Sequence, residues 1–499
     1  MSGRDENRGR PRNRLLALAL LCVGGCAVGP DFVRPEPPRS TGYTARELPR
    51  ETTVAGGRAQ RFEPGPVAAD WWQLFASPVL DDLITQALAA NPTLQAAQAS
   101  LRQSEDQLRA GYAVFLPQID ATGAASRQRS FAPSTNFPKK TFNLFTLAGT
   151  VEYAFDVFGG ERRAVESQSA QVDVQRYETA AAYLTLVGNL INAMIAQAAY
   201  TAEIAATQRL IERGHDQVQI TDAQASAGTV PYTGVLAIQT QVAATEAQLP
   251  ALEQKRTQTR HLLATLLGEE PAAWKSSQIE LAAFELPRDV PVTLPSELVR
   301  QRPDILAAEA QLHSASAQIG VATAAMFPQL TLSGSYGSAS TSIADLFSGP
   351  AAAWAIGGQL AQPIFHGGAL WFQRRAAIDG YNQSAATYRQ TVLEGLAQVA
   401  DALRALQHDA TQVEAQSRQE DTAHEALRVI DVTYRAGLAN YLDVLVADIQ
   451  YNQATIARIG GQAQRLQDTV ALFVALGGGW WAVQDRIVGD CNVHPSRRG

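Results

Sequence analysis

The sequence predicts a mainly α-helical fold that also carries part of a membrane β-barrel, and three observations point to it. First, 46% of the 499 residues are hydrophobic but only 18% are charged, against roughly 25% charged residues in an ordinary soluble chain. Second, long segments of helical periodicity alternate with segments of about ten residues in which apolar and polar side chains alternate, as they do in strands. Third, the whole order of elements occurs twice, which indicates a tandem duplication.

The charge and the motifs exclude several classes of protein. The formal net charge is −7, and the chain lacks the basic stripe that phosphate binding requires, so nucleic acid is not expected as a partner. No P-loop or GxGxxG motif is present, and His424-Glu425 lacks the second histidine of a zinc-protease helix. We therefore predict no enzyme activity, no catalytic residue, no metal site and no cofactor.

The first thirty residues indicate the compartment. An arginine-rich start is followed by the apolar run from Leu15 to Val23, which is too short to span a bilayer and is typical of a signal peptide. The small residues before Cys26 resemble a bacterial lipobox, so we expect residues 1–25 to be removed and Cys26 to be acylated. An ordinary secretory signal with an incidental cysteine is the alternative.

Matching landmarks separated by about 210 residues define the repeat. They are Asn91-Pro92 with Arg302-Pro303, Phe115-Leu116-Pro117-Gln118 with Met326-Phe327-Pro328-Gln329, Gly159-Gly160 with Gly367-Gly368, and Ala227-Gly228 with Ala436-Gly437. We predict a lipid-anchored N-terminal segment over 26–70, a first repeat over 71–285, a second over 286–478 and a C-terminal tail over 479–499.

Each repeat is predicted to hold a helix, two strands, a long helix and a return helix. The first repeat has a helix over 78–114, strands over 117–130 and 146–157, a long helix over 161–226 and a return helix over 231–267. The second has a helix over 296–326, strands over 328–340 and 353–365, a long helix over 368–436 and a return helix over 440–476. Glycines mark the strand-to-helix turns at Gly159, Gly160, Gly367 and Gly368, and Gly228 and Gly437 have the residue type that ends helices.

The strands have one apolar and one polar face, as transmembrane barrel strands do, although a soluble β-sandwich shows the same alternation. A membrane does not tolerate the open edges that four strands leave. If the strands span a membrane, other copies of the chain must complete the barrel, with 8 strands in a dimer or 12 in a trimer. The long helical hairpins would close into a helical cylinder in the same way.

The order of motifs resembles one family, the TolC-like outer-membrane efflux factors, and specifically their OprM/NodT lipoprotein branch. The residues that carry the resemblance are Cys26-Ala27-Val28-Gly29-Pro30-Asp31-Phe32 with Arg34-Pro35, Asp70-Trp71-Trp72-Gln73-Leu74-Phe75, Phe115-Leu116-Pro117-Gln118, Asp156-Val157-Phe158-Gly159, Arg300-Gln301-Arg302-Pro303-Asp304-Ile305, Pro363-Ile364-Phe365-His366-Gly367-Gly368, and Tyr434-Arg435-Ala436-Gly437 with Asn440-Tyr441-Leu442-Asp443-Val444-Leu445. The resemblance covers almost the whole chain.

The resemblance implies a homotrimer with a 12-stranded outer-membrane barrel and a 12-helix periplasmic tunnel. It implies a lipid-anchored duct that passively conducts small molecules such as antibiotics or toxic compounds. The partners would be a periplasmic adaptor, an inner-membrane pump of the resistance–nodulation–division class and the lipid of the outer membrane. An exit duct for type I protein secretion and a periplasmic coiled-coil scaffold are the alternatives.

The resemblance also places a gate at the periplasmic helix ends, where the family has acidic rings. It implies that Asp443 lines this gate, with Leu442 as the apolar constriction. The family often has a second aspartate three positions later, but this chain has Val446 there and its next acid is Asp448. Since 443 and 448 do not share a helix face, either one could instead be an ordinary solvated residue.

The ends of the hairpins are the expected docking surface for the adaptor. The residues proposed for it are Gly228, Thr229, Gly437 and Asn440. The alternative is that these residues only make turns.

Overall fold

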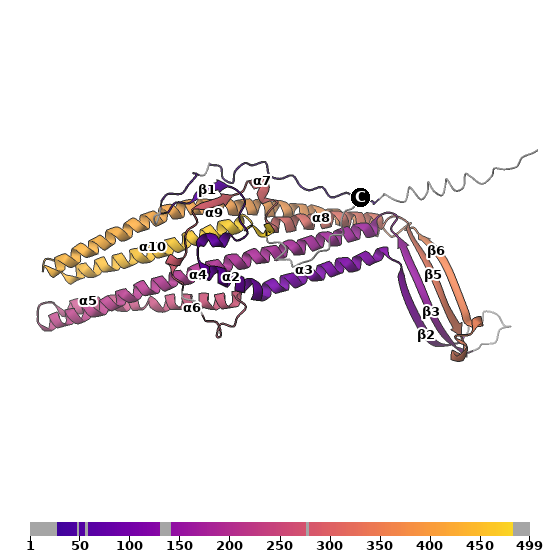
Figure 1. Cartoon of the computed structure of the whole chain (residues 1–499), viewed down its shortest axis with the longest axis horizontal. Helices are drawn as coiled ribbons and strands as arrows, with labels where there is room; N and C mark the ends of the chain where they lie inside the picture. The colour runs from indigo at the N-terminus through magenta and orange to yellow at the C-terminus, as the bar shows by residue number, and fades with distance from the viewer. Residues whose placement is uncertain (1–26, 47–48, 55–57, 130–140, 276–278, 483–499) are drawn as a thin grey trace, which may run out of the picture. The chain divides into compact units, whose positions relative to one another are not determined.

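The computed structural model describes residues 27–46, 49–54, 58–129, 141–275 and 279–482. The chain forms two compact units, each assembled from separate stretches of sequence (Figure 1). Unit 1 contains residues up to Pro35 together with Arg102–Val174 and Ala308–Tyr388. Unit 2 contains Glu36–Leu101, Gln175–Ala307 and the residues from Arg389 onward.

Unit 1 is built on a four-stranded antiparallel sheet in the order β2-β3-β5-β6. The strands are β2 (Gln118–Arg129), β3 (Thr141–Phe155), β5 (Gln329–Ser340) and β6 (Ala352–Ala361). The central pairing of β3 with β5 joins the two repeats into one sheet. The observed strands overlap all four predicted segments, and β3 begins five residues before the predicted 146.

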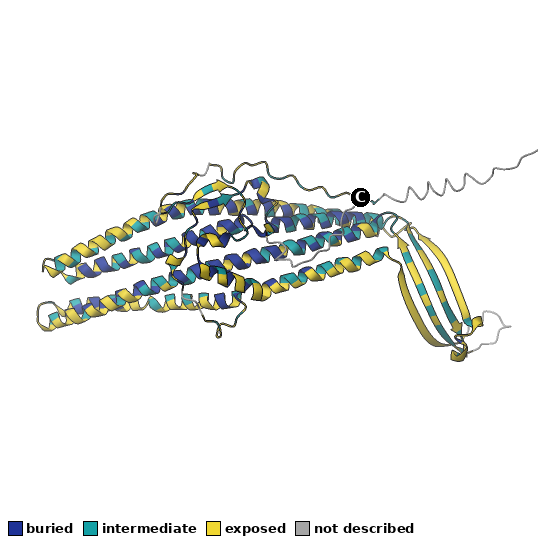
Figure 2. Ribbon diagram, viewed as in Figure 1, coloured by how far each residue is buried: buried dark blue, intermediate teal, exposed yellow. Residues whose placement is uncertain are grey.

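The register of the sheet separates an apolar face from a polar one. Ile119 pairs with Val151, and the same row continues through Gly334 to Ile356. The adjacent row, which points the other way, runs from Gln118 through polar Glu152 and Ser333 to Gly357. The apolar side chains stay uncovered: Ile119, Trp354 and Ile356 are 73–75% exposed. Every residue of β2 and β6 is exposed, as the yellow of these strands in Figure 2 shows.

Four helices contribute one end each to unit 1 and continue along the chain into unit 2. They are α3 (Pro92–Gly111), α4 (Gly160–Ser226), α8 (Pro303–Ala324) and α9 (Ala369–Arg435). The turns that lead from strand to long helix use backbone conformations that favour glycine, with φ of 78° at Gly159, 58° at Gly367 and 83° at Gly368. Gly160 is the first residue of α4.

Unit 2 contains the remaining elements. They are β1 (Arg61–Pro64), α2 (Pro78–Ala90), α5 (Tyr232–Glu246), α6 (Leu249–Leu266), β4 (Asp289–Val292), α7 (Pro295–Leu298) and α10 (Tyr441–Ala475), with 3₁₀ turns in the two units at Trp71–Phe75, Tyr112–Phe115, Leu281–Ala283, Ile343–Asp345, Gly349–Ala351 and Trp480–Ala482. Strands β1 and β4 pair in parallel, so the stretch between the repeats is packed structure.

Two predicted helices are interrupted. The helix expected over 78–114 divides into α2 and α3 at Asn91, whose side chain accepts from the backbone N–H of Leu94 and so caps α3. The return helix expected over 231–267 divides at Ala247-Gln248. Pro250 explains this second break, because it has no N–H and its ring crowds the carbonyl of Glu246, four residues earlier.

The core of unit 2 is aromatic. The rings of Trp71 and Phe473 stack with centroids 5.0 Å apart, and Phe75 contacts both. Helix α4 supplies fully buried residues such as Leu190 and Met194 to the same cluster. Among the described helices, α4 alone is long and apolar enough to cross a membrane, but 67% of its apolar window is buried in the structure, as expected of a core helix.

Candidate functional site

The candidate site is the set of hairpin ends in unit 2, where α4 turns into α5 and α9 turns into α10. Both long helices end in the same hydrogen-bond motif. The N–H of Thr229 donates to the carbonyl of Gln224 and that of Gly228 to Ala225, while Leu438 donates to Thr433 and Gly437 to Tyr434. This is the Schellman pattern, which needs a left-handed residue at the glycine position; φ is 74° at Gly228 and 76° at Gly437.

Asn440 and Asp443 cap the start of α10 reciprocally. The backbone N–H of Asp443 donates to Oδ1 of Asn440 at 3.1 Å, and the backbone N–H of Asn440 donates to Oδ2 of Asp443 at 3.3 Å. The carboxylate also lies where the partial positive charge of a helix N-terminus stabilises it. Asp443 therefore has a structural role in the single chain, and its side chain remains exposed.

Asp448 lies on the opposite side of α10 and is buried against α4. Its carboxylate is 2.7 Å from the guanidinium of Arg213, and its side chain is only 11% exposed whereas that of Arg213 is 48% exposed. Burial raises the pKa of Asp448 above its ordinary value, and the charge of Arg213 opposes that shift. The ion pair joins the α9–α10 hairpin to the α4–α5 hairpin.

Further contacts near the ends also join the two hairpins. The amide of Gln224 on α4 donates to the hydroxyl of Tyr434 on α9 at 3.4 Å, and the ring of Tyr434 packs on Tyr441 with centroids 5.5 Å apart. Burial raises the pKa of Tyr441, and the charge of Asp448 adds to this effect. A small apolar cluster of Ile238, Val242 and Leu445 lies beneath these polar contacts.

The structure separates the three predicted gate residues. Leu442, which is 54% exposed, and Asp443 lie on the exposed side of α10 together with Val446. Asp448 does not join them, as the helical spacing of 443 and 448 indicates. The sequence analysis did not predict its partner Arg213, because helical periodicity cannot pair two residues that lie on separate helices far apart in the chain.

All four predicted docking residues are exposed at the hairpin ends: Gly228, Thr229, Gly437 and Asn440. Leu438 lies between Gly437 and Asn440 in the same predicted tip, and its apolar side chain is 80% exposed. The predicted lipidation site Cys26 and most of the predicted tail lie outside the described residues.

Within the described ranges, no three His, Cys, Asp or Glu side chains gather closely enough to hold a metal ion. The hairpin ends are joined by the ion pair of half-exposed Arg213 with buried Asp448 and by the hydrogen bond of Gln224 with Tyr434.

A sheet with an exposed apolar face and, among the described residues, no further strand beside β2 or β6, combined with paired long helical hairpins, is the layout of one subunit of an outer-membrane channel. A model of the family described as "Outer membrane efflux protein" matches residues 83–269 and again 294–478. The chain belongs to this outer membrane efflux protein family, and the resemblance seen in its motifs is confirmed.

Known proteins match this chain over nearly its full length. The chain is 30% identical over 475 residues to the pyoverdine export outer membrane protein OpmQ of Pseudomonas aeruginosa, covering 94% of this chain and 97% of that protein. It is 29% identical over 473 residues to the toluene efflux pump outer membrane protein TtgC of Pseudomonas putida, covering 93% and 95%. The open-state structure of the Neisseria gonorrhoeae MtrE outer membrane channel superposes with a TM-score of 0.79 at 25% identity, covering 91% and 98%.

These comparisons establish the class of function. The protein is the outer-membrane component of an efflux system, and it acts as a duct rather than as an enzyme. Such channels work together with pumps and adaptors.

Proposed function

We propose that three copies of this chain form a continuous exit duct, with a 12-stranded barrel in the outer membrane and a 12-helix tunnel in the periplasm. The sheet of unit 1 carries this proposal. Its apolar face is exposed, and among the described residues β2 and β6 each have no strand along their outer edge. Lipid does not tolerate open edges, and three copies of four strands give a closed barrel within the known size range.

The long helices support a tunnel of the same symmetry. Each chain contributes two long helices, α4 and α9, and two return segments, α5 with α6 and α10. Three chains therefore supply the twelve helical segments of the tunnel. The exposed hairpin ends then form the rim of the duct. We propose that Gly228, Thr229, Gly437 and Asn440, together with Leu438, receive the tip of a periplasmic adaptor that links the duct to an inner-membrane pump of the resistance–nodulation–division class.

Acylation of Cys26 would anchor each chain to the outer membrane from its periplasmic side. The basis is the short apolar run that ends in Val23-Gly24-Gly25-Cys26, which has the layout of a signal peptide. Covalent lipid adds to the attachment that the barrel already provides. The helical part then extends from the membrane into the periplasm.

The cargo class we propose is small molecules. One relative is named for pyoverdine export and another for toluene efflux, which supports this class over secreted proteins. The pump mainly determines the specificity of such a system, because a passive duct needs no binding site of its own. Export of a protein substrate is the alternative outcome of a transport assay.

The gate we propose has two parts with different roles. Leu442 and Asp443 form the exposed constriction at the rim, where three copies of Asp443 would repel one another and attract cations. Arg213 and Asp448 hold the α9–α10 hairpin against the α4–α5 hairpin and so keep the constriction narrow. Opening requires this pair to separate.

Export with a defective sheet tests the proposal. In Gly337→Val the new side chain begins 2.4 Å from the carbonyl oxygen of Leu147, whereas in Gly358→Val it meets nothing within 4 Å. We expect Gly337→Val to lose both trimers on native mass measurement and export of a toxic small molecule, and Gly358→Val to retain both. Export that persists without trimers would contradict the trimeric duct.

A further inference from the structure

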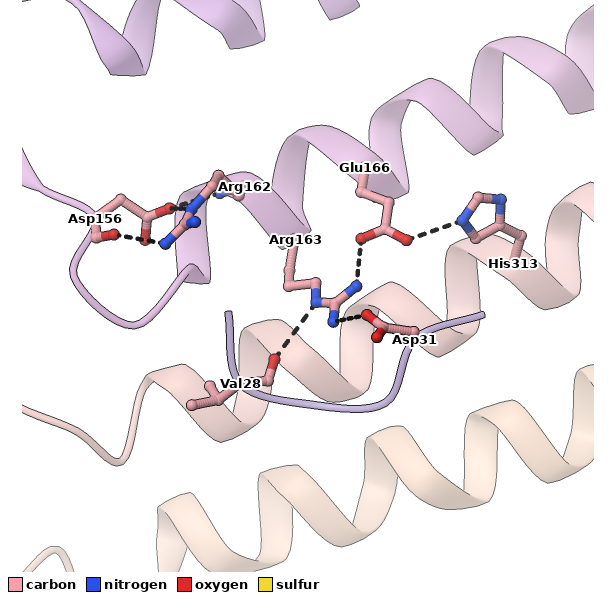
Figure 3. A network of polar contacts seen from close by, with 7 residues as sticks. All are labelled: Val28, Asp31, Asp156, Arg162, Arg163, Glu166 and His313. Atoms are coloured by element: carbon pink, nitrogen blue, oxygen red, sulfur yellow. Dashed lines mark hydrogen bonds and ion pairs between the residues drawn. The ribbon is translucent and has the colours of Figure 1, made fainter. Parts of the chain in front are cut away.

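The segment that directly follows Cys26 is fixed in unit 1 by a set of contacts that the channel function does not explain. Figure 3 shows Val28 and Asp31 of this segment beside Arg163 and Glu166 of α4 and His313 of α8. The backbone N–H of Val28 donates to the carbonyl of Phe158 at 2.9 Å. The segment is therefore hydrogen-bonded at its second residue, which is close to the proposed lipid.

Glycines let the segment lie directly on the helices. Gly29 has a φ of 99°, and a Cβ placed on it would lie 2.5 Å from Cα of Gly320 on α8. A Cβ on Gly320 would in turn lie 3.0 Å from the carbonyl oxygen of Val28 and 2.6 Å from the side chain of Arg163. At the other side, a Cβ on Gly159 would lie 2.6 Å from Cα of Ala27. These close approaches leave no room for a side chain at Gly29, Gly159 or Gly320.

Arg163 is the centre of the polar contacts. Its guanidinium donates to Oδ1 of Asp31 at 2.6 Å, to Glu166 at 2.7 Å and to the carbonyl of Val28 at 3.4 Å. Its side chain is only 7% exposed. Burial opposes the charge of Arg163, but the two carboxylates outweigh it and raise its pKa above the ordinary value.

Two more contacts extend this attachment along the segment. Oε1 of Glu166 accepts a hydrogen bond from Nε2 of His313 at 2.9 Å, and the ring of Phe32 stacks on His313 with centroids 4.4 Å apart. Arg34 pairs with Glu309 on α8 at 2.7 Å. A buried guanidinium that loses partners is costly, so release of the segment would leave Arg163 without two of its three acceptors.

We infer that residues 27–34 form a strap that holds the lipid-bearing end of the chain at the strand-to-helix junction, and that Arg163 is its positioning residue. This inference rests on the proposed acylation of Cys26. The strap fixes the acyl chains beside the sheet of their own chain, where they enter the same leaflet that the strands reach. A flexible tether would let the lipid insert anywhere within the reach of the segment.

Spin-label mobility on the strap tests this inference in the full-length protein. Val33 is 79% exposed, so a nitroxide on Val33→Cys, in a chain with Cys491→Ser, reports the motion of the strap without displacing a contact. We expect an immobilised spectrum in the parent chain. Arg163→Gln and Gly320→Ala should lose the immobilised component. Arg109→Gln and Gly380→Ala should retain it, since Arg109 pairs with Asp106 on its own helix and a Cβ on Gly380 meets nothing within 4 Å.

A variant that cannot disturb the core keeps the test decisive. The side chain of Asp31 is 91% exposed, so Asp31→Ala removes one partner of Arg163 while the trimer persists on a native gel, and it should also mobilise the label. An unchanged spectrum in Arg163→Gln, Gly320→Ala and Asp31→Ala would overturn the strap.

The unacylated chain separates the strap from the lipid anchor. Cys26→Ser, secreted with a non-lipoprotein signal, should leave the label immobilised, because protein contacts alone hold the strap. A label that becomes mobile in Cys26→Ser would show that the lipid holds the segment and would overturn the inference. The mass of the N-terminal peptide reports acylation independently, so failure of the proposed anchor and failure of the strap are distinguishable.

Discussion

Arg213 on α4 and Asp448 on α10 form an ion pair of 2.7 Å at the hairpin ends, with Asp448 buried and Arg213 half-exposed. The pair joins two hairpins that belong to different repeats of the sequence. Because one partner is half-exposed, its contribution is on the order of 1 kcal/mol. A contact of this strength can hold a constriction and still be broken by a docking partner.

Arg213→Gln should therefore raise the open probability of the reconstituted channel several-fold, since 1.4 kcal/mol corresponds to about tenfold in an equilibrium. Single-channel recording measures this directly. Arg428→Gln is the matched control, because Arg428 pairs with Glu425 on its own helix and joins no hairpins. Equal open probabilities in the two variants would remove the pair from the gate.

The role of Asp443 as a charge and its role as a helix cap can be separated. Asp443→Asn keeps an oxygen for the N–H of Asn440 but removes the charge, whereas Asn440→Ala removes half of the capping box and keeps the charge. Asn440→Ala should cost about 1 kcal/mol of local stability and leave block by divalent cations unchanged. Asp443→Asn should weaken the block. If the two variants change the block equally, the carboxylate acts only as a cap.

The hairpin end at Gly437 offers a test of docking with its own control. Gly437→Ala and Gly437→Glu both place a side chain on a backbone with a φ of 76°, which costs about 1–2 kcal/mol for any L-residue. A Cβ there meets nothing within 4 Å, so neither clashes. We expect trimers from both, export from Gly437→Ala and no export from Gly437→Glu. Export by Gly437→Glu would exclude this tip from docking.

A pair of acids in unit 2 predicts a pH dependence of stability. Burial, followed by a hydrogen bond to Asp468 and the repulsion of its charge, raises the pKa of Asp409 to about 7, while Arg465 opposes the shift. A carboxyl with a raised pKa in the folded state stabilises the fold at low pH, and this contribution is lost as the pH rises from about 4 through 7. The thermal midpoint should therefore fall over this range.

Asp409→Asn should remove this part of the pH dependence, because an amide cannot be ionised and donates to Asp468 at every pH. The exposed acid Asp222 on α4 supplies the control variant Asp222→Asn. Thermal unfolding in detergent at pH 5 and pH 8 compares the three chains. Identical slopes in all three would show that other groups determine the pH dependence.

The local rules of the sequence located the elements but not the contacts between them. Alternation predicted the four strands, and glycine at a left-handed position marked both hairpin ends, because each signal is local. The break before α6 was missed, although Pro250 signals it, because the apolar periodicity continues on both sides of the break.

Contacts between distant residues were not predictable from a single sequence. The pairs Arg213 with Asp448 and Arg163 with Asp31 each join residues that no periodicity relates. Asp443 was recognised through its motif, whereas its capping role follows from Asn440 three residues earlier, which is a readable helix-start signal. The burial of Asp448 depends on a neighbouring helix, which the spacing along α10 alone does not specify.

Conductance across a planar bilayer is the most direct test of the duct. Purified full-length trimers, added to one side of the bilayer, should produce stepwise, cation-selective current increments, and Asp448→Asn should increase the fraction of time spent open. Folded trimers that insert into the membrane but give no current increments, in the parent chain and in Asp448→Asn, would contradict a continuous passage through the protein.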